Sequence, residues 1–201
     1  MNKFLVPILA IVLLAGSLAF AAQTFQEWRF NNNNVTPAPD PVTFNNPYGN
    51  PALRVAPGPG GWISGQDGRT GIWSLSGEID IIIPNRPVIE GWKVIDLYVV
   101  WKAGNLDQFL PDVPLVGVQT NPQYEHLEMS QEQTVLQGPG DWRETWYKIT
   151  VWPNPDTEWL AIKGDILVDE VRVTTECVPE PATVGLLGLG GLALLRARRK
   201  R

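Results

Sequence analysis

The chain has 201 residues, with 16 basic and 21 acidic side chains, a net charge of −5 and one cysteine. Residues 1–21 and 178–201 hold six of the basic and one of the acidic residues, so residues 22–177 keep 10 basic and 20 acidic residues and a net charge of −10. A segment this acidic repels nucleic acid and anionic membranes, so divalent cations and neutral glycans are the more plausible ligands. A single cysteine excludes an internal disulfide.

Residues 1–21 have the three parts of a secretory signal peptide. Lys3 supplies a positive charge, the stretch from Phe4 to Phe20 is apolar apart from Ser17, and Ala19-Phe20-Ala21 places small residues at the positions that a signal peptidase reads. We expect signal peptidase to cleave here and the mature chain to begin near Ala22. The alternative is an uncleaved anchor.

Residues 22–177 have the composition of one all-β domain. They contain all nine tryptophans, many β-branched residues, abundant Gly and Pro, and no stretch of helical periodicity. About eight strands are expected, in a two-sheet antiparallel sandwich of jelly-roll type. Short strands are predicted near Gln26–Phe30, Ala52–Val55 and Leu115–Val118.

Residues 31–61 are rich in Asn, Pro and Gly, which favours a long loop. A disordered linker is the alternative. Tyr48, Leu53 and Val55 give the segment apolar anchors, and for this reason we expect it to lie on the sandwich.

Two longer runs alternate in polarity as strands do. The first extends from Gly71 to Ile83 as one half-buried strand with a bulge near Gly77. Its predicted core face consists of Trp73, Leu75, Ile79, Ile81 and Ile83, and its other face of Ser74, Ser76, Glu78 and Asp80. The second, Lys93–Trp101, is fairly apolar on both faces and is therefore expected to be a central strand, with Ile95, Leu97, Val99 and Trp101 turned inward.

Further strands are predicted at Glu144–Trp152, Glu158–Lys163 and Ile166–Thr174. In the first of these, alternation turns Tyr147, Ile149 and Val151 inward. A stacking surface for sugar rings, with hydrogen-bonding groups between two tryptophans, would then face outward: Trp146, Lys148, Thr150 and Trp152. The alternative is that a second layer covers these tryptophans.

The residues suited to catalysis are few. His126 is the only histidine, which excludes a His-rich zinc site, and no nucleophile elbow accompanies it. We expect it in an exposed loop or at a strand edge. Glycoside hydrolysis needs two carboxylates about 5 to 9.5 Å apart across a cleft. The pairs Glu78 with Asp80 and Glu125 with Glu128 are candidates, although such pairs are usually solvated.

The closing strand suggests a structural calcium ion. The segment Gly164–Val173 resembles the last strand of carbohydrate-binding-module-like and galactose-binding-like jelly rolls, and this resemblance implies that Asp169 lies near a calcium site. Asp165, Asp67 and Asp80 are further carboxylates to test, because calcium needs several oxygen ligands. No other cofactor is expected.

The last 24 residues consist of three segments: a Pro-Glu-Pro element, an apolar stretch and a basic end. Pro179-Glu180-Pro181 is held extended by its prolines, and residues 182–195 are uncharged and would span roughly 21 Å as a helix, against about 30 Å for a bilayer core. Five cations that would stay on the cytoplasmic side then follow, at Arg196, Arg198, Arg199, Lys200 and Arg201. A buried core helix is the alternative for residues 182–195, but it gains nothing from such a basic end.

This tail resembles the PEP-CTERM sorting domain of bacterial surface proteins, which an exosortase recognises. The resemblance implies a single-pass inner-membrane precursor, removal of the tail near the Pro-Glu-Pro element, and display on the cell surface or in the extracellular matrix. We expect a non-enzymatic structural or adhesive role with extracellular polysaccharide as a ligand. The alternative is a surface glycan hydrolase or lyase.

Overall fold

The computed structural model of the protein describes residues 23–57, 61–75, 77–85, 91–104, 115–119 and 126–179. Within them the chain forms eleven β-strands and no helix, which confirms the all-β class. The same residues contain no apolar helix of membrane-spanning length. All eleven strands lie between residues 23 and 179, and every strand except β8 contributes side chains to one shared hydrophobic core.

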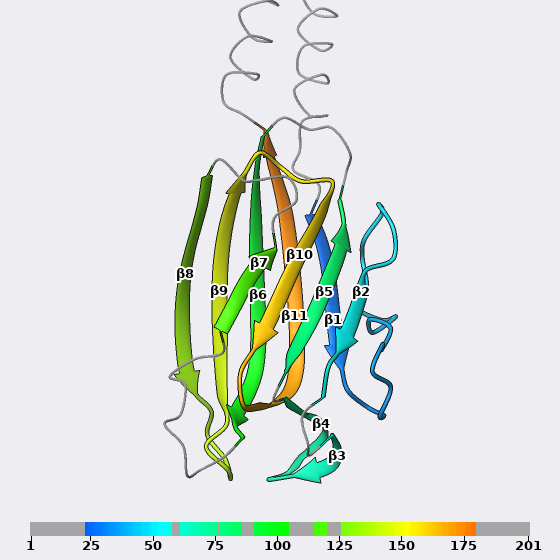
Figure 1. The fold of residues 1–201 in the computed structure, drawn as a ribbon, viewed down its shortest axis with the longest axis vertical. Coiled ribbons are helices and arrows are strands. Elements are labelled where there is room, and N and C mark those ends of the chain that lie inside the picture. Colours follow the sequence, from blue (N-terminus) through cyan, green and yellow to red (C-terminus); the bar gives the residue numbers. More distant parts are fainter. Residues whose placement is uncertain are drawn as a thin grey trace, which may run out of the picture.

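The strands form two antiparallel sheets packed face to face, as predicted (Figure 1). The larger sheet has the order β3-β4-β11-β6-β9-β8, with β1 also paired to β11. Its strands are β1 (Gln23–Arg29), β3 (Trp62–Gln66), β4 (Arg69–Leu75), β6 (Gly91–Ala103), β8 (His126–Val135), β9 (Arg143–Trp152) and β11 (Ile166–Pro179). The smaller sheet has the order β2-β5-β10-β7, from β2 (Ala52–Val55), β5 (Glu78–Pro84), β7 (Leu115–Gln119) and β10 (Thr157–Lys163).

The long strand β11 organises the larger sheet. One edge pairs with β6 along almost its whole length, while the other pairs first with β4, over Ile166–Val168, and then with β1, over Glu170–Glu176. Asp169 falls at the switch between these two partners, where the register with β6 shifts as in a β-bulge. The bulge therefore marks the point at which two different strands share one edge of β11.

A single hydrophobic core fills the space between the sheets. Strands β6 and β9 contribute Ile95, Leu97, Val99, Trp101, Tyr147, Ile149 and Val151, all turned inward as the alternation predicts. Strand β6 lies between β11 and β9, which confirms its central position. The core face of the Gly71–Ile83 run is confirmed too, since Trp73, Leu75, Ile79, Ile81 and Ile83 are all buried there.

The prediction of one bulged strand from Gly71 to Ile83 is wrong. The chain forms β4 in the larger sheet, crosses the sandwich around Gly77, and continues as β5 in the smaller sheet. Both strands face the same core, and the alternation of polar and apolar residues therefore continues across the crossing. Periodicity alone cannot separate a bulge from a change of sheet in such a case.

A second, smaller cluster lies on the outer face of the larger sheet, the face turned away from the smaller sheet. It consists of Ile72, Tyr98, Val100, Trp142 and Leu167, with Ile63 and Leu136 packed against it. The β3–β4 hairpin supplies part of this cluster through Ile63 and Ile72. Its turn is Asp67-Gly68, with φ of 53° and 80°, as type I′ turns require.

Other boundaries differ from the predictions. Strands β3 and β8 were not predicted, and β11 extends to Pro179 rather than ending at Thr174. His126 is the first residue of the edge strand β8, as expected of a strand-edge histidine. In residues 31–57, Leu53 and Val55 of β2 are buried, and the Val55 amide donates to Val35 O at 2.7 Å, so this part of the predicted loop lies on the sandwich.

Candidate functional site

The outward residues of β9 are where the sequence pattern places them. Trp146 is 45% exposed, Lys148 is exposed, and Thr150 and Trp152 are half-buried. On this outer face the cross-strand register brings them beside residues of β6 and β8. The four predicted residues therefore belong to a wider surface, which we call the aromatic face: the outward side chains of β6, β8 and β9 from Trp146 to Trp152.

One row of the aromatic face crosses four strands. Trp146 pairs with Tyr98 of β6 and with Glu132 of β8, and Tyr98 pairs in turn with Arg172 of β11. The Trp146 and Tyr98 rings lie 4.4 Å apart between centroids, and the Arg172 guanidinium carbon lies 4.8 Å from the Tyr98 centroid. These contacts hold the tryptophan ring in a defined position on the surface.

The Tyr98 hydroxyl donates to Glu144 Oε2 at 2.9 Å. Burial is the main cause that raises the pKa of this hydroxyl, and the neighbouring Glu144 carboxylate adds to it. The hydroxyl therefore stays protonated, and its hydrogen bond to Glu144 fixes the Tyr98 ring next to Trp146. Arg172 is held on its other side by an ion pair with Glu170.

A second aromatic row lies near the end of the sandwich at which β11 ends. Trp152 lies 6.5 Å from Trp92 between ring centroids, and Trp92 packs edge-on against His126 at 4.9 Å. Trp152 is six positions after Trp146 on β9, which corresponds to roughly 20 Å along a strand. The face thus carries two aromatic positions with polar groups between them.

The polar interval between the rows is hollowed. The hollow is lined by Glu128, Met129, Ser130, Lys148 and Thr150, from β8 and β9. Lys148 pairs in register with Asp96 and Ser130, and Thr150 with Glu128. Cationic, anionic and hydroxyl groups therefore occur within two rows of one another, as hydrogen-bonded recognition of a polyhydroxy ligand requires.

The predicted calcium residues do not lie in one shared carboxylate group. Asp169, in the bulge of β11, is engaged by the Arg69 guanidinium of β4. Burial raises the pKa of the Asp169 carboxyl, and Arg69 opposes that rise. Asp165 is exposed in the turn before β11, where its carbonyl accepts from the Gly104 amide at 3.0 Å.

The other two carboxylates named for calcium also lie apart from that turn. Asp67 is paired with Lys102 at 2.8 Å, and Asp80 lies on β5 of the smaller sheet. Across the described parts of the chain, no three His, Cys, Asp or Glu side chains gather as metal ligands do. A calcium ion held by Asp165 and Asp169 remains a prediction.

The carboxylate pairs considered for hydrolysis are placed as follows. Glu78 and Asp80 are half-buried on β5, with Glu78 held by Lys163 Nζ at 2.8 Å. They line a hollow on the outer face of the smaller sheet together with Arg54 and Trp159. Glu128 contacts His126 Nε2 at 3.0 Å, and its predicted companion Glu125 lies outside the described residues.

Trp159 is a surface aromatic that the sequence analysis did not single out. It lies on β10, is 47% exposed, and belongs to the hollow beside Glu78 and Asp80. The signal was available in the sequence, because Trp159 alternates with the buried Leu160 and Ile162 in the same way that Trp146 alternates with Tyr147.

The C-terminal motif begins inside the fold. Pro179 is the last residue of β11 and lies in register with Gly91 of β6. Glu180, Pro181, residues 182–195 and the basic end from Arg196 to Arg201 lie outside the described residues, as does the predicted signal peptide at 1–21. No extra stretch of chain therefore separates the folded strand from the motif.

Comparison with protein families matches residues 178–201 to the PEP-CTERM protein-sorting motif. Comparison with curated proteins and with solved structures gave no significant match. The motif identifies the C-terminus as an exosortase sorting signal, whose apolar segment fits a transmembrane tail. The chain is thus exported as a membrane-anchored precursor and sorted to the cell surface.

Proposed function

We propose that the exported domain is a non-enzymatic structural or adhesive component of the cell surface or extracellular matrix, and that it binds extracellular polysaccharide on its aromatic face. The single observation that carries this proposal is the arrangement of Trp146 and Trp152, two outward tryptophans on one strand with a polar hollow between them. Flat sugar rings stack on such rings, and their hydroxyls bond to the groups between.

Two further features support the proposal. The Trp146 ring is held against Tyr98 before any ligand arrives, which reduces the entropy lost on binding. The surface is open and extended rather than a closed pocket, and such a surface suits a polymer chain better than a small molecule. The net charge of −10 on residues 22–177 favours neutral polysaccharides over strongly anionic ones.

The test is affinity electrophoresis of the exported domain, residues 22–179, in gels that contain soluble neutral glucans, mannans or galactans. We expect retardation in at least one gel, and a loss of at least tenfold in affinity, about 1.4 kcal/mol, for Trp146→Ala and for Trp152→Ala. Trp159→Ala is the matched control, because that tryptophan is equally exposed on the other sheet.

Retardation that survives both Trp146→Ala and Trp152→Ala, or that only Trp159→Ala removes, would refute the aromatic face as the binding surface. The same samples are assayed for reducing ends and for unsaturated products. Turnover of a retained polysaccharide that Glu78→Gln abolishes would replace the binding role by a hydrolase or lyase.

A further inference from the structure

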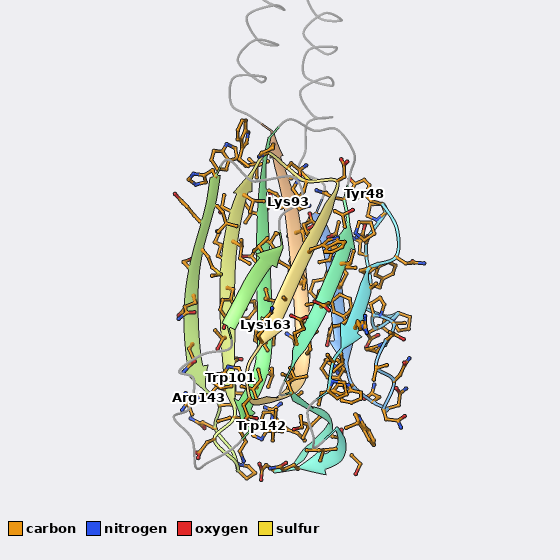
Figure 2. The ribbon with its side chains drawn as sticks, in the orientation of Figure 1. Tyr48, Lys93, Trp101, Trp142, Arg143 and Lys163 are labelled. Atoms are coloured by element: carbon orange, nitrogen blue, oxygen red, sulfur yellow. The ribbon has the colours of Figure 1, made fainter. Side chains whose placement is uncertain are left out.

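A group of polar side chains is buried between the two sheets, at the end of the sandwich where β11 ends. We call it the lysine cluster: Asn85, Lys93, Asn154, Glu158 and Cys177. Figure 2 labels Lys93 in this part of the sandwich. The Lys93 and Glu158 side chains are 0% exposed, and Asn85 and Cys177 are buried with them. Lysine and glutamate are almost never buried to this extent.

Strand register explains why these groups meet. Lys93 is on the inward face of β6, two residues before Ile95, and it pairs with Cys177 of β11. Glu158 is on the inward face of β10 and pairs with Ile83 of β5, while Asn85 follows two residues later on the same face. The larger sheet therefore contributes an amine and a thiol, and the smaller sheet contributes a carboxyl group and a carboxamide.

The amine contacts both groups of the opposite sheet at once. Lys93 Nζ lies 2.8 Å from Glu158 Oε1 and donates to Asn85 Oδ1 at 2.8 Å. The Asn85 amide nitrogen points away, donating to Asn154 Oδ1 at 2.5 Å and to the Pro155 carbonyl at 2.6 Å. Because Lys93 has only donors, this network fixes which end of the Asn85 amide faces the amine.

Few hydrogen bonds offset the free-energy cost of burying the ion pair between Lys93 and Glu158. Within the described residues, neither carboxylate oxygen of Glu158 has a hydrogen bond of good geometry, although Oε1 is within ion-pair distance of Nζ. Burial raises the pKa of the Glu158 carboxyl, against the opposing effect of Lys93. Transfer of one proton from the ammonium to the carboxylate removes both charges from the core.

We propose that Lys93 and Asn85 join in an intramolecular amide bond, with Glu158 as the proton acceptor that activates the lysine. Loss of a proton to Glu158 leaves the Lys93 amine neutral and frees the lone pair on Nζ. In the folded core this amine attacks Cγ of Asn85, and an Nζ–Cγ bond forms while the Cγ–Nδ2 bond breaks. The group that departs is ammonia.

The reaction balances without an oxidant or a reductant. Of the three protons on the Lys93 ammonium, one goes to Glu158, one goes to the departing Nδ2, and one stays on the new amide nitrogen. Negative charge develops on Asn85 Oδ1 during the attack. The Cys177 thiol, 3.3 Å away, donates a hydrogen bond to that oxygen and stabilises the charge. The groups need no other catalyst because folding itself holds them in contact.

The product would tie the end of β5 in the smaller sheet to the start of β6 in the larger one. That position is next to the sorting motif, since Lys93 and Cys177 are two residues from the register pair of Gly91 and Pro179. This inference is independent of polysaccharide binding, because the cluster lies in the core and the aromatic face lies on the outside.

Intact-mass spectrometry of the folded domain, residues 22–179, tests the proposal. We expect a mass lower than that of the sequence by one ammonia, about 17 Da, since the carboxamide loses its NH₂ group. Lys93→Met and Glu158→Gln are expected at their full masses. Lys163→Met is the control, because that lysine is paired with Glu78 on the surface and its loss leaves the deficit in place.

Peptide mapping locates the bond. Glu90 separates Asn85 from Lys93 in the sequence, so cleavage after glutamate gives two chain segments joined only through the new amide. This branched pair distinguishes the bond from a succinimide, which also loses ammonia but joins no second segment. It also decides the question from the unsubstituted domain alone, if either variant fails to fold.

The expected result is the mass deficit, the branched pair, and loss of both in Lys93→Met. A folded domain at its full sequence mass would overturn the proposal. So would a deficit that persists in Lys93→Met, because the ammonia would then come from another reaction.

Discussion

Replacement of Gly71 by alanine should destabilise the domain far more than the same change at Gly68 or Gly117. Gly71 lies in β4 with φ of +76°, and a Cβ atom there would be 2.0 Å from the Phe30 carbonyl oxygen and 2.6 Å from its carbonyl carbon. These are backbone atoms just after β1, at the place where β1 and β4 meet along one edge of β11. Neither strand can move without disturbing its pairing with β11.

The cost has two parts. A left-handed backbone costs a non-glycine residue about 1–2 kcal/mol, and forcing packed backbone apart adds about 1–3 kcal/mol. We therefore expect the free energy of unfolding to fall by about 3 kcal/mol in Gly71→Ala. For a domain of this size, this corresponds to a fall in Tm of roughly 6–12 °C.

Urea and thermal unfolding of the exported domain measure this effect against two controls. Gly68 has a similar φ of +80° but nothing within 4 Å of a new Cβ, so Gly68→Ala isolates the backbone cost of about 1–2 kcal/mol. Gly117 lies in β7 with open space around it, and Gly117→Ala should change stability by less than about 0.5 kcal/mol. If Gly71→Ala unfolds at the same urea concentration as Gly68→Ala, the proposed junction of β1 and β4 is wrong.

Two further predictions concern the buried charges. Burial raises the pKa values of the Glu158, Asp169 and Glu170 carboxyls, so the folded state holds protons that the unfolded chain has released. These carboxyls contribute their full stabilisation at a pH below their pKa values in the unfolded chain, and they lose it as the pH rises through their pKa values in the folded domain. The urea concentration at the midpoint of unfolding should therefore increase as the pH falls from 7 toward about 5. Glu158→Gln should reduce the dependence of the urea midpoint on pH. Glu132→Gln, on the exposed edge strand, should leave it unchanged. An equal pH dependence in the two variants would contradict the burial argument. Arg69→Ala should cost about 2 kcal/mol, because it removes the partner of Asp169 and the guanidinium 5.0 Å from the Trp142 ring centroid. If the loss in Arg69→Ala/Asp169→Ala equals the sum of the two single losses, measured by urea unfolding, the two residues are not coupled.

Sequence alternation was sufficient where a strand has one face in the core and neighbours on both sides. In β6 and β9 every apolar residue that was predicted to face inward is buried in the core, because burial between two sheets enforces a period of two. The aromatic face follows from the same rule. It could be read from β9 alone, but its companions Tyr98 and Trp92 became visible only through the register with β6.

Strands β3 and β8 show where alternation fails. Strand β8 is an edge strand whose residues are mostly exposed on both faces, so no apolar period marks it in the sequence. Strand β3 is short and half-exposed, and its main signal is the Asp67-Gly68 turn that follows it rather than its own pattern.

The lysine cluster was also encoded but not recognised. Lys93 has the same parity as Ile95 and Leu97, and Glu158 the same parity as Leu160 and Ile162, so alternation places both charges inward. Neither Lys93 nor Glu158 was assigned a face or a role from the sequence. Their proximity depends on the packing of two sheets, which no local pattern records.

The length of β11 determines how the domain responds to tension. Strand β1 runs antiparallel to β11, with Gln23 opposite Glu176, so the described chain begins and ends at the same end of the sandwich. A pull on the C-terminus acts along the axis of β11, across hydrogen bonds that run perpendicular to it toward β6 and β1. These ladders are loaded in shear, and many bonds must break together before the strand slides. A cell-surface protein that is held by its C-terminus and loaded through the body of the domain would therefore yield abruptly at high force, because these bonds cannot break one at a time.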